Sequence, residues 1–291
     1  MTFKKFYNIN EGGNAFKETI SIQQKDIQKT VDTLESDVLE PLGFKTKGKD
    51  WELLGSALKK SAPSGDIDIA LVVKSIEHFK DLAENYLEKK GIENKYFPVS
   101  KTLSIKYPIP DKEDFVQVDL MFTDDLQYTI FSRFSPHEKD STAIKTKFGV
   151  YRNLFLASIA AEIAYKVLEK NPDGNPKVIE KYALNVEDGL FKNTLDYTEK
   201  NLKKPKVLKK ELVTKDPAKI VKILLGDTAT VADADSFESI NKFVQSPKFK
   251  YKEKINKIKE KYKVALDSYD LEIPKELGRI VTGKQIGRAH V

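Results

Sequence analysis

The stretch that decides the fold is LLGSALKKSAPSGDIDIALVV, residues 53–73. Its small-residue pair Gly55-Ser56 is followed, after nine residues, by Asp66 and Asp68 within a run of branched apolar residues. Such a run predicts a buried strand, and side chains alternate between the two faces of a strand. We therefore expect Asp66 and Asp68 to share one face, with the isoleucines between and after them on the other.

Two carboxylates held side by side repel each other, and a hard cation such as Mg²⁺ relieves that repulsion by taking oxygen ligands from both. A third carboxylate, Asp119, lies in FVQVDLMF (residues 115–122), whose β-branched and aromatic residues predict another strand. If the two strands are neighbours, three carboxylates converge. Three carboxylates are enough to hold two metal ions for an in-line displacement at phosphorus.

The Gly-Ser pair, the spacer, the DID triplet and the later VDL together resemble the nucleotidyltransferase superfamily that includes DNA polymerase β. Poly(A) polymerases, CCA-adding enzymes, cyclic-oligonucleotide synthases and aminoglycoside adenylyltransferases share this core. The resemblance covers roughly residues 24–155, about one domain. More faintly, NINEGGNAF near the start and FGVYRNLFLASIA further on resemble nucleotidyltransferases of tailed bacteriophages. An α+β fold is implied, with a mixed sheet covered by helices on one face.

The resemblance implies transfer of NMP from an NTP to an acceptor hydroxyl, with release of pyrophosphate. Asp66 and Asp68 would ligate two Mg²⁺ (or Mn²⁺) ions, and Asp119 would complete the site of the ion that activates the nucleophile. Gly55 and Ser56 would hold the β- and γ-phosphates through backbone amides and the hydroxyl. A surface pair of carboxylates is the plain alternative for any isolated DxD, and a relative that keeps the fold without turnover is another.

Two basic residues are further candidates for contacts with the nucleotide phosphates. Lys59 lies in the spacer, where it adds positive charge or is simply solvated at the surface. Arg152 begins the apolar segment 151–170, at the junction that lines the nucleotide cleft in the superfamily. For Arg152 a structural role, bonding a strand-end carboxylate, is the competing interpretation.

Composition indicates a globular intracellular protein, and we expect a cytoplasmic one from a bacterium or a phage-infected cell. The chain has 291 residues, 40% of them hydrophobic and 32% charged, which is enough for two domains. It has no cysteine, and its three histidines are far apart, which argues against disulfides and a zinc centre. No apolar run approaches the roughly 20 residues that span a bilayer, and the N-terminus lacks the apolar core of a signal peptide.

We expect a catalytic domain over 1–148, a mostly α-helical domain over 149–277 and a tail from 278. The end, IGRAHV (286–291), resembles the translation of a sequencing-library adapter and carries no functional argument. In the first domain the patterns predict helices over 24–39 and 76–90 and strands over 51–54, 66–73, 96–99, 102–107, 115–122 and 127–134. In the second they predict helices over 151–170, 178–182, 217–225, 236–244 and 252–268.

The acceptor is the more open question. The net charge is +6, and lysines crowd the segments 200–210 and 248–263, the second of which also holds aromatic residues. This favours an RNA or another nucleic-acid 3′ end as acceptor, although a solvated lysine-rich face explains the lysines slightly better, because the second cluster lacks arginine. A small molecule, a nucleotide or a protein hydroxyl are alternative acceptors, and a non-catalytic nucleic-acid-binding protein is the alternative from another class. The sequence leaves the oligomeric state open.

Overall fold

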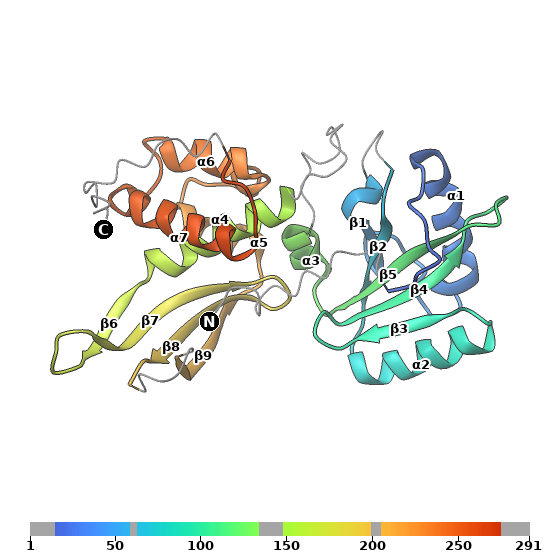
Figure 1. Ribbon diagram of the computed structural model, residues 1–291, viewed down its shortest axis with the longest axis horizontal. Helices are drawn as coiled ribbons and strands as arrows, with labels where there is room; N and C mark the ends of the chain where they lie inside the picture. Colours follow the sequence, from blue (N-terminus) through green and yellow to red (C-terminus); the bar gives the residue numbers. More distant parts are fainter. Residues whose placement is uncertain (1–14, 59–62, 134–147, 199–204, 275–291) are drawn as a thin grey trace, which may run out of the picture.

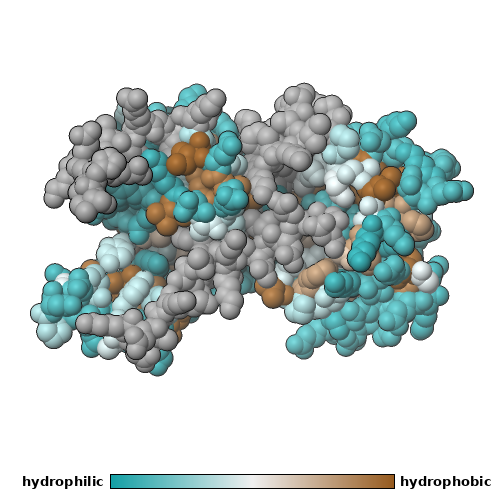
Figure 2. Space-filling model, viewed as in Figure 1, coloured by the Kyte–Doolittle hydropathy of each residue, from teal (hydrophilic) through white to brown (hydrophobic). Residues whose placement is uncertain are grey.

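The computed structural model describes residues 15–58, 63–133, 148–198 and 205–274, which form two lobes (Figure 1). The first lobe holds a five-stranded sheet, and the second holds a four-stranded sheet with most of the later helices. Within these ranges no helix is both long enough and apolar enough to cross a membrane. The outer side of the first lobe, around helix α2 (Ile76–Lys89), is largely hydrophilic (Figure 2). The tail predicted from 278 lies outside the described residues.

The first sheet has the strand order β1-β2-β5-β4-β3. Only β2 and β5 are parallel neighbours, and the other pairs are antiparallel. This is the predicted mixed sheet, and the α+β class is confirmed. The strands are β1 (Trp51–Leu54), β2 (Asp66–Val72), β3 (Asn94–Phe97), β4 (Thr102–Pro108) and β5 (Phe115–Thr123).

Helices cover one face of this sheet because that face is apolar. Ile67 and Ile69 of β2 are fully buried in one cluster with Val31 of helix α1 (Gln24–Leu34) and Leu87 of α2. A π-helical turn, Glu35–Leu39, continues α1, so together the two match the predicted helix over 24–39. The opposite face of the sheet carries the polar residues of β2, β4 and β5. The alternation expected for β2 is therefore confirmed.

Helix α3 (Leu126–Arg133) connects the two lobes and corrects a prediction, because residues 127–134 were expected to form a strand. The Oδ1 atom of Asp125 accepts a hydrogen bond from the backbone N–H of Tyr128 at 2.9 Å, which caps the helix N-terminus. Leu126 packs on β1 and β2 of the first sheet, whereas Tyr128 belongs to the core of the second lobe. A helix at this position lets residues close together in sequence pack into the cores of both lobes.

The second lobe is built around α4 (Phe148–Ile163), an apolar helix buried on several sides, as expected. It holds an antiparallel sheet with the order β6-β7-β8-β9, and α4 packs along β7. The strands are β6 (Lys166–Lys170), β7 (Pro176–Asn185), β8 (Gly189–Asp196) and β9 (Lys206–Thr214). The remaining helices are α5 (Pro217–Leu225), α6 (Phe237–Gln245) and α7 (Ile255–Ser268), close to their predicted ranges.

This sheet is the main difference from the predicted helical domain. The helix predicted over 151–170 ends at Ile163, and the helix predicted over 178–182 is instead part of β7. A tight turn explains the change: the backbone N–H of Asn171 donates to the carbonyl of Asn175 at 2.8 Å and closes a hairpin between β6 and β7. In the extended form, the backbone N–H and C=O groups of β7 also find hydrogen-bond partners on β8, which favours a strand over a helix.

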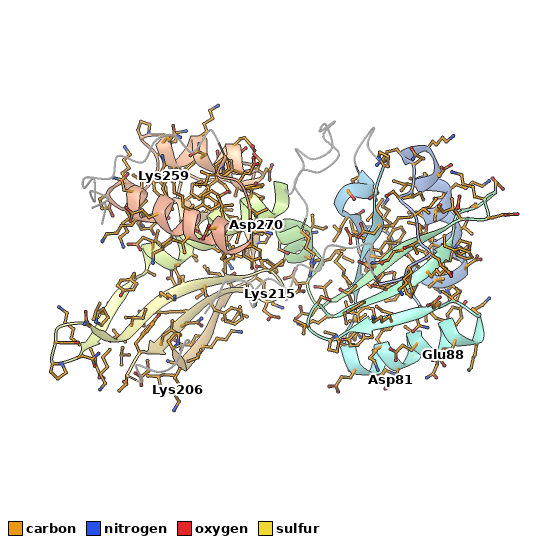
Figure 3. The ribbon with its side chains drawn as sticks, viewed as in Figure 1. Asp81, Glu88, Lys206, Lys215, Lys259 and Asp270 are labelled. Carbon is orange, nitrogen blue, oxygen red and sulfur yellow. The ribbon has the colours of Figure 1, made fainter. Side chains whose placement is uncertain are left out.

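Ion pairs join the lobes near α3. Lys101 pairs with Asp188 at 3.1 Å, and Arg133 pairs with Glu187 in the same β7–β8 turn. Lys215 pairs with Asp124 at 2.7 Å, at the point where the two lobes meet (Figure 3). These ion pairs hold the second lobe next to the polar face of the first sheet.

Candidate metal and nucleotide site

The three aspartates predicted from the sequence lie together. The parallel pairing of β2 and β5 places Asp66 opposite Gln117 and Asp68 opposite Asp119. One carboxylate oxygen from each of Asp66, Asp68 and Asp119 lies within 4.8 Å of the other two. The backbone hydrogen bonds between two parallel strands fix which residues lie opposite each other. The pairing of β2 with β5 therefore determines the position of this cluster.

The electrostatics of the cluster fit a divalent cation. Asp66 and Asp119 are each only 8% exposed. Burial, followed by the nearby charge of Asp119, raises the pKa of Asp66 to about 7. Burial also raises the pKa of Asp119, against the hydrogen bonds that its carboxylate accepts and the positive charge of Arg133. Buried carboxylates that repel each other are relieved by a cation with oxygen ligands, so this donor set suits Mg²⁺ or Mn²⁺.

The carboxylate of Asp119 is oriented by two neighbours through the same oxygen atom. Ser104 on β4 donates its hydroxyl to Oδ1 of Asp119 at 2.6 Å, and Nε2 of Gln117 donates to the same Oδ1 at 2.8 Å. The backbone N–H of Ala15 in turn donates to Oε1 of Gln117 at 2.9 Å. Hydrogen bonds to one oxygen fix the carboxylate plane, and Oδ2 would then be the oxygen offered to a metal.

Gly55 lies against Asp68, and only glycine fits there. Its φ of +65° is in the left-handed region, and a Cβ atom at this position would lie 2.1 Å from Oδ2 of Asp68. The close approach follows from β1 pairing, which places Leu54 opposite Asp68. The turn that contains Gly55-Ser56 therefore borders the acidic cluster, as the sequence motif predicted.

Ser56 lies beside the start of β2. Its hydroxyl is hydrogen-bonded to the hydroxyl of Ser64, and Ser64 donates to the backbone carbonyl of Asp66 at 2.6 Å. Nε2 of Gln24 donates to the backbone carbonyl of Ser56 at 3.3 Å. These contacts tie the 3-10 turn Gly55–Leu58 to the strand that carries the aspartates. A phosphate contact by Ser56 stays a prediction.

The two basic candidates differ from the aspartates. Lys59 lies outside the described residues. Arg152 is 1% exposed, and its Nε donates to the carbonyl of Ala234 at 2.5 Å while its Nη1 donates to the carbonyl of Phe131. Its guanidinium also lies over the Phe131 ring, 4.5 Å from the centroid. These contacts agree with the structural interpretation, although the partners are carbonyls and not the expected carboxylate.

Arg152 also borders a cavity of about 620 Å³ that is lined by α3 and by the start of α5. Ile130 lines this cavity, and it packs against Ala70, which follows Asp68 on the same face of β2. The cavity thus lies beside the part of α3 that packs on β2, and its size is that of a small-ligand pocket.

Sequence analysis missed two residues of the site. Ser104 belongs to an alternating stretch, TLSIKY (102–107), so its polar face was readable, but its pairing with Asp119 needed the strand order. Arg133 ends helix α3, where the sequence predicts a strand, and its positive charge acts on Asp119. Long-range pairing set both positions, and no local pattern reports it.

The lysine clusters of the sequence are only partly described. Lys206, Lys209 and Lys210 lie exposed on β9. On the later segment, Lys254 donates to the carbonyls of Glu162 and Ile163, at 3.1 and 3.0 Å, and Lys261 pairs with the Glu162 side chain at 3.3 Å. These last two lysines therefore serve the C-terminal end of α4.

No protein-family model and no curated protein matches the chain. Solved structures to which it is similar include polymerase beta of Leishmania infantum in a ternary P/T complex, at 18% identity over 80% of each chain and a TM-score of 0.39. Another is the Cid1 poly(U) polymerase bound to MgGTP, at 12% identity, covering 78% of this chain and 71% of that chain, with a TM-score of 0.29. A cytoplasmic RNA terminal U-transferase is similar at 12% identity over 84% and 72%, with a TM-score of 0.26. At these low TM-scores the site itself must carry the functional conclusion.

Proposed function

We propose that the chain is a metal-dependent nucleotidyltransferase of the DNA polymerase β type, which transfers NMP from an NTP to an acceptor hydroxyl and releases pyrophosphate. The observation that carries the proposal is the acidic cluster, with oxygens of Asp66, Asp68 and Asp119 within 4.8 Å of one another on parallel strands. The turn at Gly55, pressed against Asp68, supports it further.

The residues divide the work as follows. Asp66 and Asp68 would hold two Mg²⁺ or Mn²⁺ ions, and Asp119 would complete the ligands of one of them. Such ions, when bound, would supply Lewis acidity that favours the alkoxide of the acceptor and balances the charge of the leaving pyrophosphate. Ser104 and Gln117 hold Oδ1 of Asp119.

The phosphates and the nucleoside need their own binding groups. Backbone N–H groups of the Gly55-Ser56 turn, with the Ser56 hydroxyl and Lys59, would bind the β- and γ-phosphates. The cavity of about 620 Å³ beside α3 has room for a nucleoside. Arg152, whose guanidinium bonds backbone carbonyls, would shape that cavity's wall and act on the phosphates only through a rearrangement.

The proposed acceptor is an RNA or another nucleic-acid 3′ end. The net charge of +6 supports it, since positive charge attracts a phosphate backbone. We propose a division into a catalytic domain, 1–148, and a second domain, 149–277, that contributes to acceptor binding. A bacterial or phage-infected cytoplasm is the proposed setting.

The test incubates the purified protein with Mg²⁺ or Mn²⁺, each α-labelled NTP in turn and a pool of short RNAs. The Asp66→Asn/Asp68→Asn double variant is the control. We expect label on RNA with wild type and none with the variant, and acceptor binding should weaken steeply with salt. Label on a small product or on protein would keep the chemistry and replace the acceptor. No transfer with any NTP and acceptor would contradict the proposal.

A further inference from the structure

Strand β9 ends the second sheet with an outer edge that no other described strand covers. All of its residues from Lys206 to Val213 are exposed. Four of them are aliphatic, and their exposed fractions are 52% for Val207, 50% for Leu208, 52% for Leu212 and 38% for Val213. Long edge strands are usually protected by charges or by a covering element, because their free backbone groups pair readily with another strand. Contiguous exposed apolar residues often mark interaction sites.

The sequence of the strand is complementary to itself when reversed. VLKKELV (residues 207–213) reads aliphatic, aliphatic, positive, Lys210, negative, aliphatic, aliphatic. In an antiparallel pair of two copies centred on Lys210, a residue that lies a given number of positions before Lys210 faces the partner residue that lies the same number of positions after it. The facing pairs are Val207 with the partner's Val213, Leu208 with the partner's Leu212, and Lys209 with the partner's Glu211.

From this complementarity we infer that two copies of the chain associate through β9, edge to edge, in an antiparallel pair centred on Lys210. The two four-stranded sheets then form one continuous sheet across a two-fold axis, an isologous contact. Aliphatic side chains meet aliphatic side chains, and each Lys209 meets a carboxylate, pairs that stabilise antiparallel strands.

The charges of the strand suit this register. Lys209 and Glu211 already pair within one chain at 2.7 Å, so they point to the same face of the sheet. Their partners in the second copy extend that pair into an alternating set of four charges. At the axis, Lys210 would face the partner's Lys210. Its Nζ lies 3.9 Å from the centroid of the Phe191 ring on β8 of the same chain, and this contact holds the ammonium group over its own sheet. The like charges at the axis are thereby kept apart.

A nucleic-acid strand fits this edge less well. A phosphate backbone matches lysines, but here Glu211 and four exposed aliphatic residues are interleaved with them. The outer end of β9, marked by Lys206, points away from the first lobe (Figure 3). Register shifts on the β8 side, near Leu208 and Val213, restrict the regular ladder to its centre. We therefore expect a modest Kd of about 10 to 100 µM.

Charge reversal in trans tests the register. The Lys209→Glu variant places two negative charges at these positions and Glu211→Lys places two positive charges, so neither should pair with itself. Mixed in equal amounts, they should form a heterodimer, because each negative position then meets a positive one. Sedimentation velocity from 1 to 200 µM should show a concentration-dependent dimer for wild type and for the mixture, and monomers for each variant alone. The ion pair within one chain cannot produce recovery on mixing.

Cross-linking gives a second, independent measurement. The chain has no cysteine, so the thiol introduced by Lys210→Cys can form a disulfide only with the same thiol of a second copy. Facing residues of an antiparallel pair have Cα atoms about 4.5 to 5.5 Å apart, within disulfide range, and we expect rapid oxidation to a covalent dimer. The matched control, Val207→Cys, would lie about 20 Å from its copy and should stay monomeric.

Three results would overturn the inference: a wild type that stays monomeric throughout the range, variants that dimerise like wild type, or equal cross-linking at both cysteine positions. If the two charge variants changed affinity for a single-stranded oligonucleotide while every chain stayed monomeric, the edge would belong to nucleic acid instead.

Discussion

The buried carboxyl of Asp66 predicts a pH-dependent gain in stability when it is replaced by asparagine. Burial and the charge of Asp119 raise its pKa from 3.8 to about 7. A carboxyl whose pKa is higher in the folded state makes folding take up a proton, so the stability it contributes is full below about pH 4 and is lost as pH rises through about 7. Asp66→Asn removes this loss.

The size of the effect follows from that difference in pKa. The step from 3.8 to about 7 corresponds to about 4 kcal/mol at most. Because Asp66 and Asp119 titrate together, we expect about 2 to 4 kcal/mol. Without metal, the free energy of unfolding of Asp66→Asn should therefore be about 2 to 4 kcal/mol higher than that of wild type at pH 8.5. The difference should vanish near pH 4.

Urea unfolding in EDTA, followed by circular dichroism from pH 4 to 8.5, measures this. The matched control is Asp81→Asn on α2, where the side chain is 70% exposed and no pH-dependent gain is expected. Mg²⁺ should stabilise wild type at pH 8.5 and have little effect on Asp66→Asn. Parallel curves for wild type and Asp66→Asn at all pH values would refute the account of buried carboxylates that repel each other.

Three further substitutions probe the site. Gly55→Ala should lower transfer activity at least about 100-fold while far-UV circular dichroism is retained, because the new Cβ would lie 2.1 Å from Oδ2 of Asp68; near-wild-type activity would contradict that contact. Ser104→Ala should weaken Mn²⁺ binding, measured by calorimetry, about 10-fold by removing one of the two hydrogen bonds that orient Asp119, and Ser104→Thr should recover most of it; unchanged affinity would remove Ser104 from the site. Arg152→Met should lower the free energy of unfolding in urea by about 2 to 4 kcal/mol, since two buried carbonyls lose their donor, with little change in KM for NTP; a large rise in KM without loss of stability would favour the phosphate role.

The site was readable from the sequence because its information is local. Asp66 and Asp68 sit two residues apart in a strand, and that spacing alone puts them on one face. Asp119 needed one assumption, that its strand lies beside the first, and the parallel pairing of β2 and β5 confirms it. The Gly55 turn lay close enough in sequence to be included.

What was not readable depends on long-range pairing. The β6–β9 sheet went unpredicted although its turns carry signals, such as Asp188-Gly189, where Gly189 has a φ of +106°. The segment that forms β9 carries no period-2 alternation and is exposed on both faces, so its lysines indicated only a charged segment and not a strand. Helix α3 was misassigned because its apolar residues face two different cores, so they follow no single stripe. Ser104 and Arg133 reach the aspartates only through these tertiary placements.

The most direct test of the central claim is a Mn²⁺ titration, followed by electron paramagnetic resonance, with a non-hydrolysable NTP analogue present. We predict two bound ions per wild-type chain, one for Asp119→Asn and none above background for Asp66→Asn/Asp68→Asn. The double variant must first show the circular dichroism spectrum of the folded protein. The same number of bound ions in wild type and in the folded double variant would contradict the assignment of this cluster as the metal site.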